Sequence, residues 1–276
     1  MNALEIRGLT KRRGDFALQG LDLTLPAGCI MGLIGENGAG KSTTMRLILN
    51  SLRRDSGSIT IFGRDNRALT ARDREDIGVV MDEVGLPEYM TAAQIGRMMA
   101  GIFTRWQPDV YAAYLKKLGL PTDKPFKDYS RGMKMKQGLA VALSHQPKLL
   151  LLDEATSGLD PVVRDDILTI LSDFTRNEEH AVLISSHIVS DLEKICDYIA
   201  FLHRGRLLLC EEKDRLAEEY GILRGSADGI DPAAVCGRHT TPYGAEYLVR
   251  RSAVPAGLTL GRVSIEDLFV FMAREA

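Results

Sequence analysis

The chain has 276 residues, of which 45% are hydrophobic and 26% are charged, and its formal net charge is −2. This size and composition indicate an ordinary globular protein, with one large domain or one domain and a small appendage. The charge gives no reason to expect nucleic acid as a partner, and no apolar run approaches the roughly 18 residues that a membrane-spanning helix needs. The four cysteines show no C-x-x-C spacing, which argues against a zinc site and indicates reduced thiols in a cytosolic protein.

The first part of the chain predicts β-structure, and an inserted block then predicts helices. Thr91 and Gln94 form a capping box ahead of apolar residues at helical spacing. Further helices are predicted to begin at Pro108 and Arg131, so we expect a helical subdomain over residues 84–147. Alternating or apolar runs predict strands at 3–9, 20–25, 29–34, 57–62 and 77–81.

After residue 149 the predicted elements alternate between strand and helix. Strands are predicted at 149–152, 181–185 and 198–203, and helices from residue 161 and over 189–196. This alternation predicts a parallel sheet covered by helices.

The sequence pattern changes again near residue 220. A loop-like segment at 225–232, a short strand at 246–250 and a helix that opens at Ser264 predict a small accessory domain. We therefore divide the chain into a main domain, 1–220, and an accessory domain, 221–276.

A nine-residue segment between the strand at 29–34 and the next predicted helix fits the phosphate-binding pattern G-x-x-x-x-G-K-[ST]. Its glycines let several backbone N–H groups point at one anion, and the helix that follows adds its own N–H groups and dipole. Lys41 is expected to reach the β- and γ-phosphates, and the Ser42 hydroxyl to ligate Mg²⁺. The alternative is a glycine-rich turn that binds nothing, but the strand before and the helix after favour phosphate binding. The segment comprises Gly35, Glu36, Asn37, Gly38, Ala39, Gly40, Lys41, Ser42 and Thr43.

The apolar strand at 149–152 runs directly into two acidic residues, Asp153 and Glu154. Burying a carboxylate is costly unless it is paired or bound to metal. With a phosphate loop upstream, Asp153 is expected to hold Mg²⁺, and Glu154 to face the γ-phosphate and polarise water as a general base. The alternative is that both acids cap the next helix.

A third segment, 129–133, opens the helix that begins at Arg131. Ser130 is a candidate N-cap, and Gly132 lets the backbone come close to an anion. Taken alone, this segment is more typical of an ordinary helix start than of an anion site.

Together and in this order, the three segments closely resemble the ATP-binding cassette family, the nucleotide-binding subunits of ABC transporters. The resemblance covers residues 3–220, and it includes the loop at 35–43, the signature-like segment 129–133, the acidic strand with 155–160, and Ser-Ser-His at 185–187. It implies a RecA-like α/β P-loop NTPase core with an N-terminal antiparallel β region and an inserted α-helical subdomain, to which this chain adds its small C-terminal accessory domain.

The resemblance also implies how the site residues act. Two cassettes, as a homodimer or a heterodimer, would pair head to tail with ATP sandwiched between them. Ser130 and Gly132 would then contact the partner's ATP, and Asp160 would lie at the dimer contact. His187 would contact the γ-phosphate and orient the attacking water.

The chain departs from the family pattern at the base-stacking position. The family usually places an aromatic residue before a glycine near the start of the chain, where it stacks on adenine. Here Arg13 precedes Gly14. Either the guanidinium of Arg13 takes this role, or nearby Phe16 does, or neither contacts the nucleotide.

Two further departures concern charge. After the strand at 77–81 the family places glutamine as a ligand on the Mg²⁺ side, whereas this chain has Asp82. Aspartate ligates Mg²⁺ well, but its side chain is shorter, so it either binds the metal more tightly or misses it. In the signature-like segment, Arg131 and Met133 stand where glycine and glutamine are commonest. Arg131 either strengthens anion binding or faces solvent.

The function that these features favour is the ATP-hydrolysing subunit of a membrane transporter. Separate polytopic permease subunits would supply the translocation path, and the chain would lie in the cytoplasm at the inner face of the cell membrane. The groove formed by residues 82–90 and the helical subdomain would face the transporter. Similarity to single-chain cassettes with a short C-terminal extension favours an exporter. The alternatives are a soluble regulatory ATPase without a membrane partner and an inactive binding module.

Overall fold

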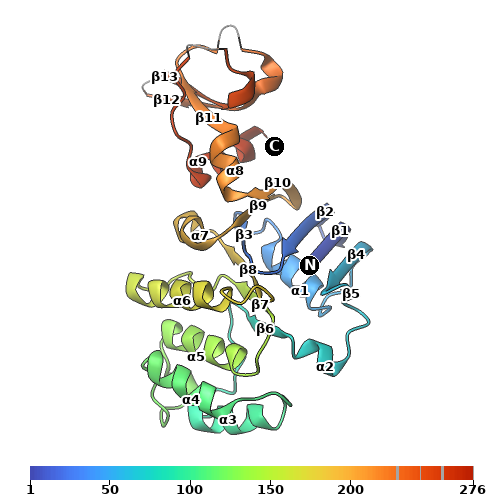
Figure 1. The fold of residues 1–276 in the computed structure, drawn as a ribbon, viewed down its shortest axis with the longest axis vertical. Coiled ribbons are helices and arrows are strands. Elements are labelled where there is room, and N and C mark those ends of the chain that lie inside the picture. The colour runs from blue at the N-terminus through green and yellow to red at the C-terminus, as the bar shows by residue number, and fades with distance from the viewer. Residues whose placement is uncertain (228–229, 243, 256–257, 276) are drawn as a thin grey trace.

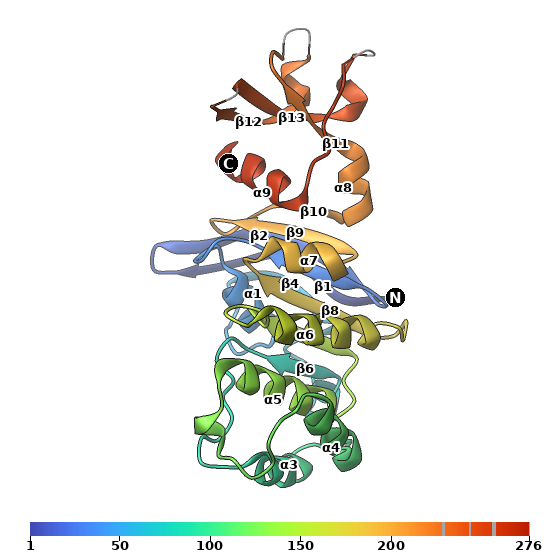
Figure 2. The same cartoon turned by 90° about the vertical axis from the view of Figure 1, so that its left-hand side faces the viewer.

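The computed structural model describes residues 1–227, 230–242, 244–255 and 258–275, which form an elongated molecule (Figure 1). Two sheets lie together in the middle, a group of helices forms one end, and a small sheet with helices beside it forms the other end (Figure 1 and Figure 2). None of the helices in the described residues is long and apolar enough to cross a bilayer.

Strands that are distant in the sequence assemble into a mostly parallel central sheet. They are β3 (Ile30–Ile34), β6 (Ile77–Val80), β7 (Leu149–Asp153), β8 (Ala181–Ser186), β9 (Tyr198–His203) and β10 (Arg206–Glu212). Their order is β10-β9-β3-β8-β7-β6, and neighbours are parallel except for the antiparallel hairpin of β9 and β10. The predicted parallel sheet is confirmed.

Alternate residues of the central strands face two different hydrophobic cores, because side chains along a strand point to opposite faces. Leu150 and Leu152 pack among the helices, whereas Leu149 and Leu151 pack with the N-terminal strands. Burial on both sides explains why this strand is a run of leucines without alternation.

The N-terminal antiparallel β region is also confirmed. It consists of β1 (Asn2–Arg13), β2 (Phe16–Pro26), β4 (Ser56–Ile61) and the short β5 (Arg64–Asp65), in the order β2-β1-β4-β5. Its apolar residues share one core with α1 (Lys41–Ile48) and one face of the central sheet. The first two strands are longer than predicted, and β5 is not predicted.

Helices form the end of the molecule opposite the C-terminal region (Figure 1). They are α3 (Ala92–Ala100), α4 (Pro108–Lys117) and α5 (Arg131–Leu143), with a 3₁₀ turn at Phe126–Asp128. The predicted capping box is present, since Thr91 Oγ1 accepts from the Gln94 N–H at 3.3 Å and Gln94 Oε1 accepts from the Thr91 N–H at 2.8 Å. The predicted helical subdomain is confirmed.

The remaining helices before the C-terminal region are α2 (Ala71–Arg74), α6 (Pro161–Phe174) and α7 (Val189–Ile195). The apolar residues of α6 and α7 pack on the same face of the central sheet as those of α5. The single-turn α2 has no buried residue, so it lacks the apolar stripe by which a helix is predicted.

The C-terminal region contains a small antiparallel sheet, with one helix before it and one helix after it in the chain. Its elements are α8 (Lys213–Glu219), β11 (Tyr220–Arg224), β12 (Val235–Thr241), β13 (Gly244–Arg250) and α9 (Ile265–Glu275), with strand order β11-β13-β12. Phe269 of α9 meets Phe201 of β9 edge to face, with ring centroids 5.4 Å apart. The division at residue 220 stays a prediction, and residues 228–229 of the predicted loop lie outside the described residues.

Two details of the central sheet differ from the sequence prediction. The predicted strand at 29–34 begins at Ile30, so half-buried Cys29 precedes the strand. The strand β10 is not predicted, although the turn before it contains a glycine, which is typical of a hairpin turn. Arg204 and Gly205 have φ values of +43° and +78°, the backbone conformation of a two-residue hairpin.

Candidate functional site

The loop between β3 and α1 has the backbone of an anion cradle. Gly38 and Gly40 have φ values of +84° and +114°, which residues other than glycine rarely adopt. No side chain caps the first turn of α1, so its free N–H groups are available to a ligand. A Cβ on Gly35 would lie 2.4 Å from the carbonyl oxygen of Leu202. The loop is therefore packed tightly against β9, which fixes its position.

Lys41, the first residue of α1, is 5% exposed and lies folded against its own loop. Its Nζ donates to the carbonyl oxygens of Gly35 at 2.6 Å and Glu36 at 3.3 Å. The same nitrogen forms an ion pair with Glu154 Oε1 at 3.1 Å. The positive charge is thus held beside the loop that is built to receive an anion.

The two acidic residues at the end of β7 are held by a serine of the neighbouring strand. Ser185 Oγ donates to Asp153 Oδ1 at 2.6 Å, and it accepts from the backbone N–H of Glu154 at 3.2 Å. In the sequence Ser185 stands out only as part of the Ser-Ser-His motif, because nothing in its local pattern shows that it lies opposite Asp153. The aspartate is 2% exposed, and this hydrogen bond helps to offset the cost of burying its charge.

Glu154 connects the phosphate loop to His187. Its Oε2 lies 2.7 Å from Nδ1 of His187, while its Oε1 faces Lys41. The backbone of Glu154 has a φ of +53°, and a non-glycine residue in this region is uncommon and tends to mark a functional site. The carboxylate can therefore interact with a cation on one side and an imidazole on the other.

Two neighbouring cavities lie beside the phosphate loop. The larger, of about 460 Å³, includes Ser42, Asp82 and Asp153 in its lining. The other, of about 390 Å³, is lined by Arg13, Phe16, Glu36, Asn37, Gly38, Gly40, Lys41, Ser42, Thr43, Asp82 and Glu154. The structure thus brings together the residues that the sequence predicted for phosphate and metal binding, except that Gly35 and Ala39 of the loop line neither cavity. Asp82 contributes to both cavities.

Arg13 and Phe16 face each other across the turn between β1 and β2. Both line the 390 Å³ cavity. The ring of Phe16 packs close to the phosphate loop, because a Cβ on Gly40 would lie 2.8 Å from its Cζ. The hairpin therefore forms one wall of the cavity.

Ser130, Gly132 and Asp160 do not line either cavity. Ser130 is the N-cap of α5 and accepts from the Met133 N–H at 3.3 Å. Asp160 is the N-cap of α6 and accepts from the Val163 N–H at 3.0 Å. Within one chain these residues therefore start helices, and the structure does not bring them to the phosphate loop.

Comparison with known proteins identifies the family. A model described as "ABC transporter" matches residues 18–157. The lantibiotic transport ATP-binding protein SrtF of Streptococcus pyogenes is 35% identical over 217 residues, which cover 76% of this chain and 91% of that protein. The chain belongs to the ABC transporter family. It is an ABC ATPase, the ATP-binding subunit of a membrane transporter.

Two further comparisons add to this assignment. The cassette is 34% identical over 225 residues to the Nod factor export ATP-binding protein I of Rhizobium sp. (strain N33), covering 79% of this chain and 73% of that protein. It also shares its fold with a dimeric ATP-binding cassette solved in a post-hydrolysis state with ADP and phosphate. The TM-score is 0.68 at 20% identity, with 76% of this chain and 98% of that chain covered.

The structure of the cassette also shows a link that sequence analysis missed. Arg164 of α6 donates to the carbonyl oxygen of Leu159 at 3.2 Å and pairs with buried Asp191 at 3.4 Å. It thereby joins the segment before Asp160 to α7, the helix that follows His187. An arginine on a helix gives no local signal for such a role, because its partners lie on other elements.

Proposed function

We propose that this cassette binds Mg·ATP in the 390 Å³ cavity and, closed by a second cassette, hydrolyses it with Glu154 as the general base. One observation carries the proposal: the Glu154 carboxylate lies between Lys41 Nζ, at 3.1 Å, and His187 Nδ1, at 2.7 Å. A carboxylate in this position, beside a phosphate loop, is suited to take a proton from water, and the imidazole is suited to orient that water.

The loop 35–43 would bind the phosphates through its backbone N–H groups, and Lys41 would exchange the carbonyl oxygen of Gly35 for phosphate oxygens. On the hairpin wall, Phe16 is packed against Gly40. The guanidinium plane of exposed Arg13 is therefore the better surface on which adenine can stack.

Mg²⁺ fits the oxygen donors beside the loop. Among the described residues, no group of three His, Cys, Asp or Glu side chains could hold a metal ion. Mg²⁺ that binds with a nucleotide commonly takes phosphate and water oxygens as its other ligands. We therefore assign Ser42 and Asp153 as ligands, with Asp82 as a third. The ion would neutralise phosphate charge when bound.

A second cassette would complete the site with Ser130, Gly132 and Asp160, as a homodimer or a heterodimer. A Cβ on Gly132 would meet nothing within its own chain closer than 3.6 Å, so packing inside the chain does not require glycine there. Close approach of a partner's nucleotide would require it. The dimeric state of the solved cassette with the same fold supports this arrangement.

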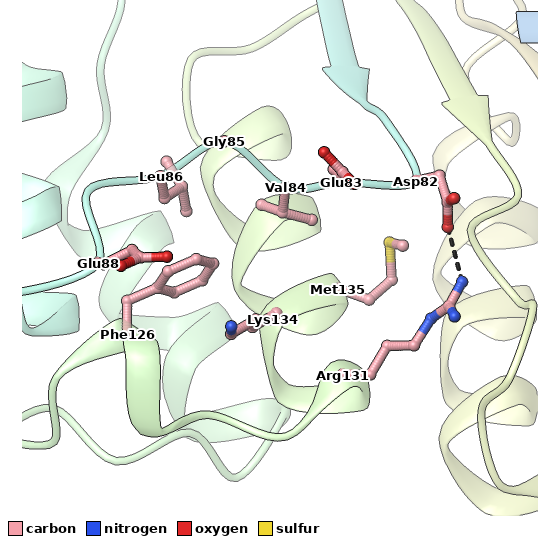
Figure 3. Close-up of a pocket in the computed structure, with 10 residues that line it drawn as sticks. All are labelled: Asp82, Glu83, Val84, Gly85, Leu86, Glu88, Phe126, Arg131, Lys134 and Met135. Atoms are coloured by element: carbon pink, nitrogen blue, oxygen red, sulfur yellow. Dashed lines mark hydrogen bonds and ion pairs between the residues drawn. The ribbon is translucent and has the colours of Figure 1, made fainter.

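The permease subunits would dock in the groove shown in Figure 3, between the loop after β6 and the start of α5. This groove has a volume of about 570 Å³. Apolar side chains lie beside charged ones in it, which suits an amphipathic helix of a partner. Its lining consists of Asp82, Glu83, Val84, Gly85, Leu86, Glu88, Phe126, Arg131, Lys134 and Met135.

Docking of this kind would place the cassette in the cytoplasm at the inner face of the cell membrane. The relative named for Nod factor export supports an exporter, and the permease subunits would choose the cargo. ATP-driven closure of two cassettes and reopening after hydrolysis would move those subunits between inward- and outward-facing states.

The proposal is tested by steady-state ATPase measurements at a protein concentration that allows cassettes to meet. Glu154→Gln should lower turnover by about 10²- to 10⁴-fold, the usual contribution of a general base, while ATP still binds. Glu178→Gln, an exposed glutamate away from both cavities, is the control and should leave turnover unchanged. Near-normal turnover of Glu154→Gln would remove Glu154 from the base role.

A second measurement tests the transporter role. The cassette should co-purify from membranes with hydrophobic subunits. Substitution of exposed residues in the Figure 3 groove should release the cassette from those subunits. If the cassette is isolated from its own cells and no hydrophobic membrane subunit accompanies it, a regulatory ATPase would be favoured instead.

A further inference from the structure

Two residues that depart from the family pattern contact each other. Asp82 follows β6, and Arg131 is the first residue of α5, 49 positions further along the chain. The Nη2 atom of Arg131 donates to Oδ1 of Asp82 at 2.6 Å (Figure 3). In the sequence the two residues are separate departures from the family pattern, whereas in the structure they form one ion pair.

The charges at the start of α5 explain this contact. The N-terminus of a helix carries partial positive charge, which disfavours a cation and favours an anion. The first turn of α5 contains no acidic residue, and Arg131 and Lys134 add two cations there. Asp82 supplies the missing negative charge from another element. Because the side chains of Asp82 and Arg131 are 51% and 53% exposed, the pair is weak enough to be broken.

Asp82 has a second set of neighbours. It lines the cavity of the phosphate loop with Lys41 and Glu154, and the adjoining cavity with Ser42 and Asp153. A carboxylate directed to Arg131 is not fully available to a metal ion beside Ser42. The two interactions of Asp82 therefore compete.

Arg131 also reaches the segment that leads to Asp160. A Cβ on Gly158 would lie 3.4 Å from Nη1 of Arg131. The guanidinium thus lies between the loop after β6 and the segment after β7. It therefore has neighbours on two sides, Asp82 and Gly158.

We propose that Arg131 is a positioning residue that withholds Asp82 from Mg²⁺, so that it lowers the contribution of Mg²⁺ to nucleotide binding in the single cassette. This inference rests on the proposed function, because it assumes Mg·ATP at the phosphate loop. Nucleotide binding with Mg²⁺ breaks the pair and frees both the loop after β6 and Arg131 of the signature-like segment.

The test measures the binding of an ATP analogue with a β,γ-imido link, in Mg²⁺ and in EDTA, at protein concentrations where sedimentation shows single cassettes. The ratio of the two affinities is the Mg²⁺ contribution. Arg131→Met should raise this ratio about two- to fivefold, the strength of an exposed ion pair, and leave the affinity in EDTA unchanged. Arg131→Lys, which keeps the charge, should stay close to the unsubstituted chain.

The control uses the Asp82→Ala background, in which Arg131→Met should have no effect on the ratio. Three results for Arg131→Met would overturn the inference. They are a change of the affinity in EDTA as large as that in Mg²⁺, an equal change of the ratio in the Asp82→Ala background, and an unchanged ratio in the chain that retains Asp82. These outcomes all include measurable nucleotide binding. If no variant binds the analogue in either condition, the proposed function fails as well, and the two failures are thereby distinguished.

Discussion

Glu154 and His187 are 33 positions apart in the chain, yet Oε2 of the glutamate lies 2.7 Å from Nδ1 of the histidine. Each residue follows one of two neighbouring parallel strands, β7 and β8, whose carboxyl ends meet at the same edge of the sheet. Ligands of open parallel sheets bind at this edge. The same edge carries the phosphate loop after β3, so the fold alone brings the charged groups together.

This contact predicts the effect of removing the imidazole. His187→Ala should lower ATP turnover by about 10²-fold, the lower end for a residue that assists proton transfer. Nucleotide affinity should change much less, because Lys41 and the loop remain. The matched control is His180→Ala, since His180 directly precedes β8 and His187 directly follows it. Equal loss of turnover in both variants would contradict a specific role for His187.

Substitutions of two glycines in α5 can separate packing within the chain from contact with a partner cassette. Gly132→Ala should stabilise the single cassette by up to about 0.5 kcal/mol, because alanine is the better helix former and nothing crowds the added methyl group. It should nevertheless reduce dimer formation and turnover. Urea unfolding and sedimentation with Mg·ATP measure the two effects.

The matched control for this test is Gly138→Ala in the same helix. A Cβ there would lie 3.0 Å from Cγ1 of Val84, so this variant should lose about 1 kcal/mol of stability through overpacking. A Gly132→Ala cassette that still dimerises and turns over normally would show that the signature-like segment is not approached by a partner.

His145 predicts how stability depends on pH. The residue is buried, its ring stacks on Phe103 with centroids 4.1 Å apart, and its Nδ1 lies 3.1 Å from the carbonyl oxygen of Glu75. Burial lowers the pKa of His145 from its ordinary value of 6.5. The unfolded chain therefore binds the proton more readily, and this contribution to stability is complete above pH 6.5 and is lost as the pH falls toward the folded pKa.

His145→Phe keeps the stacked ring and removes the titration. The free energy of unfolding should fall less between pH 7.5 and pH 5.5 than in the unsubstituted chain, by at most about 1.4 kcal/mol per pH unit. Urea unfolding at several pH values measures both slopes. Identical slopes would mean that His145 does not titrate differently in the folded and unfolded states.

The sequence alone predicts those parts of the site whose chemistry is local. The phosphate loop is such a part, because glycines, Lys41 and Ser42 stand at fixed spacing between a strand and a helix. The acids after β7 are another, since a leucine strand that ends in carboxylates requires a partner for their charge. The helical subdomain follows from the capping box and from apolar spacing.

The parts that could not be predicted depend on contacts between distant elements. The Asp82–Arg131 pair requires that the loop after β6 pass the start of α5, and local patterns do not specify this approach. The hydrogen bonds of Ser185 depend on the neighbouring strand in the same way. The strand β10 was missed because it is a half-buried strand at the edge of its sheet, without the regular alternation of a sheet with one buried face.

The central claim is that the loop 35–43 holds Mg·ATP while a second cassette covers it. Sedimentation of Glu154→Gln in saturating Mg·ATP tests this most directly, because blocked hydrolysis preserves the closed state. The account predicts that Glu154→Gln forms dimers that retain ATP. It predicts monomers when the chain also carries Ser130→Ala, or when EDTA removes Mg²⁺. Monomers without bound nucleotide in Mg·ATP would contradict it.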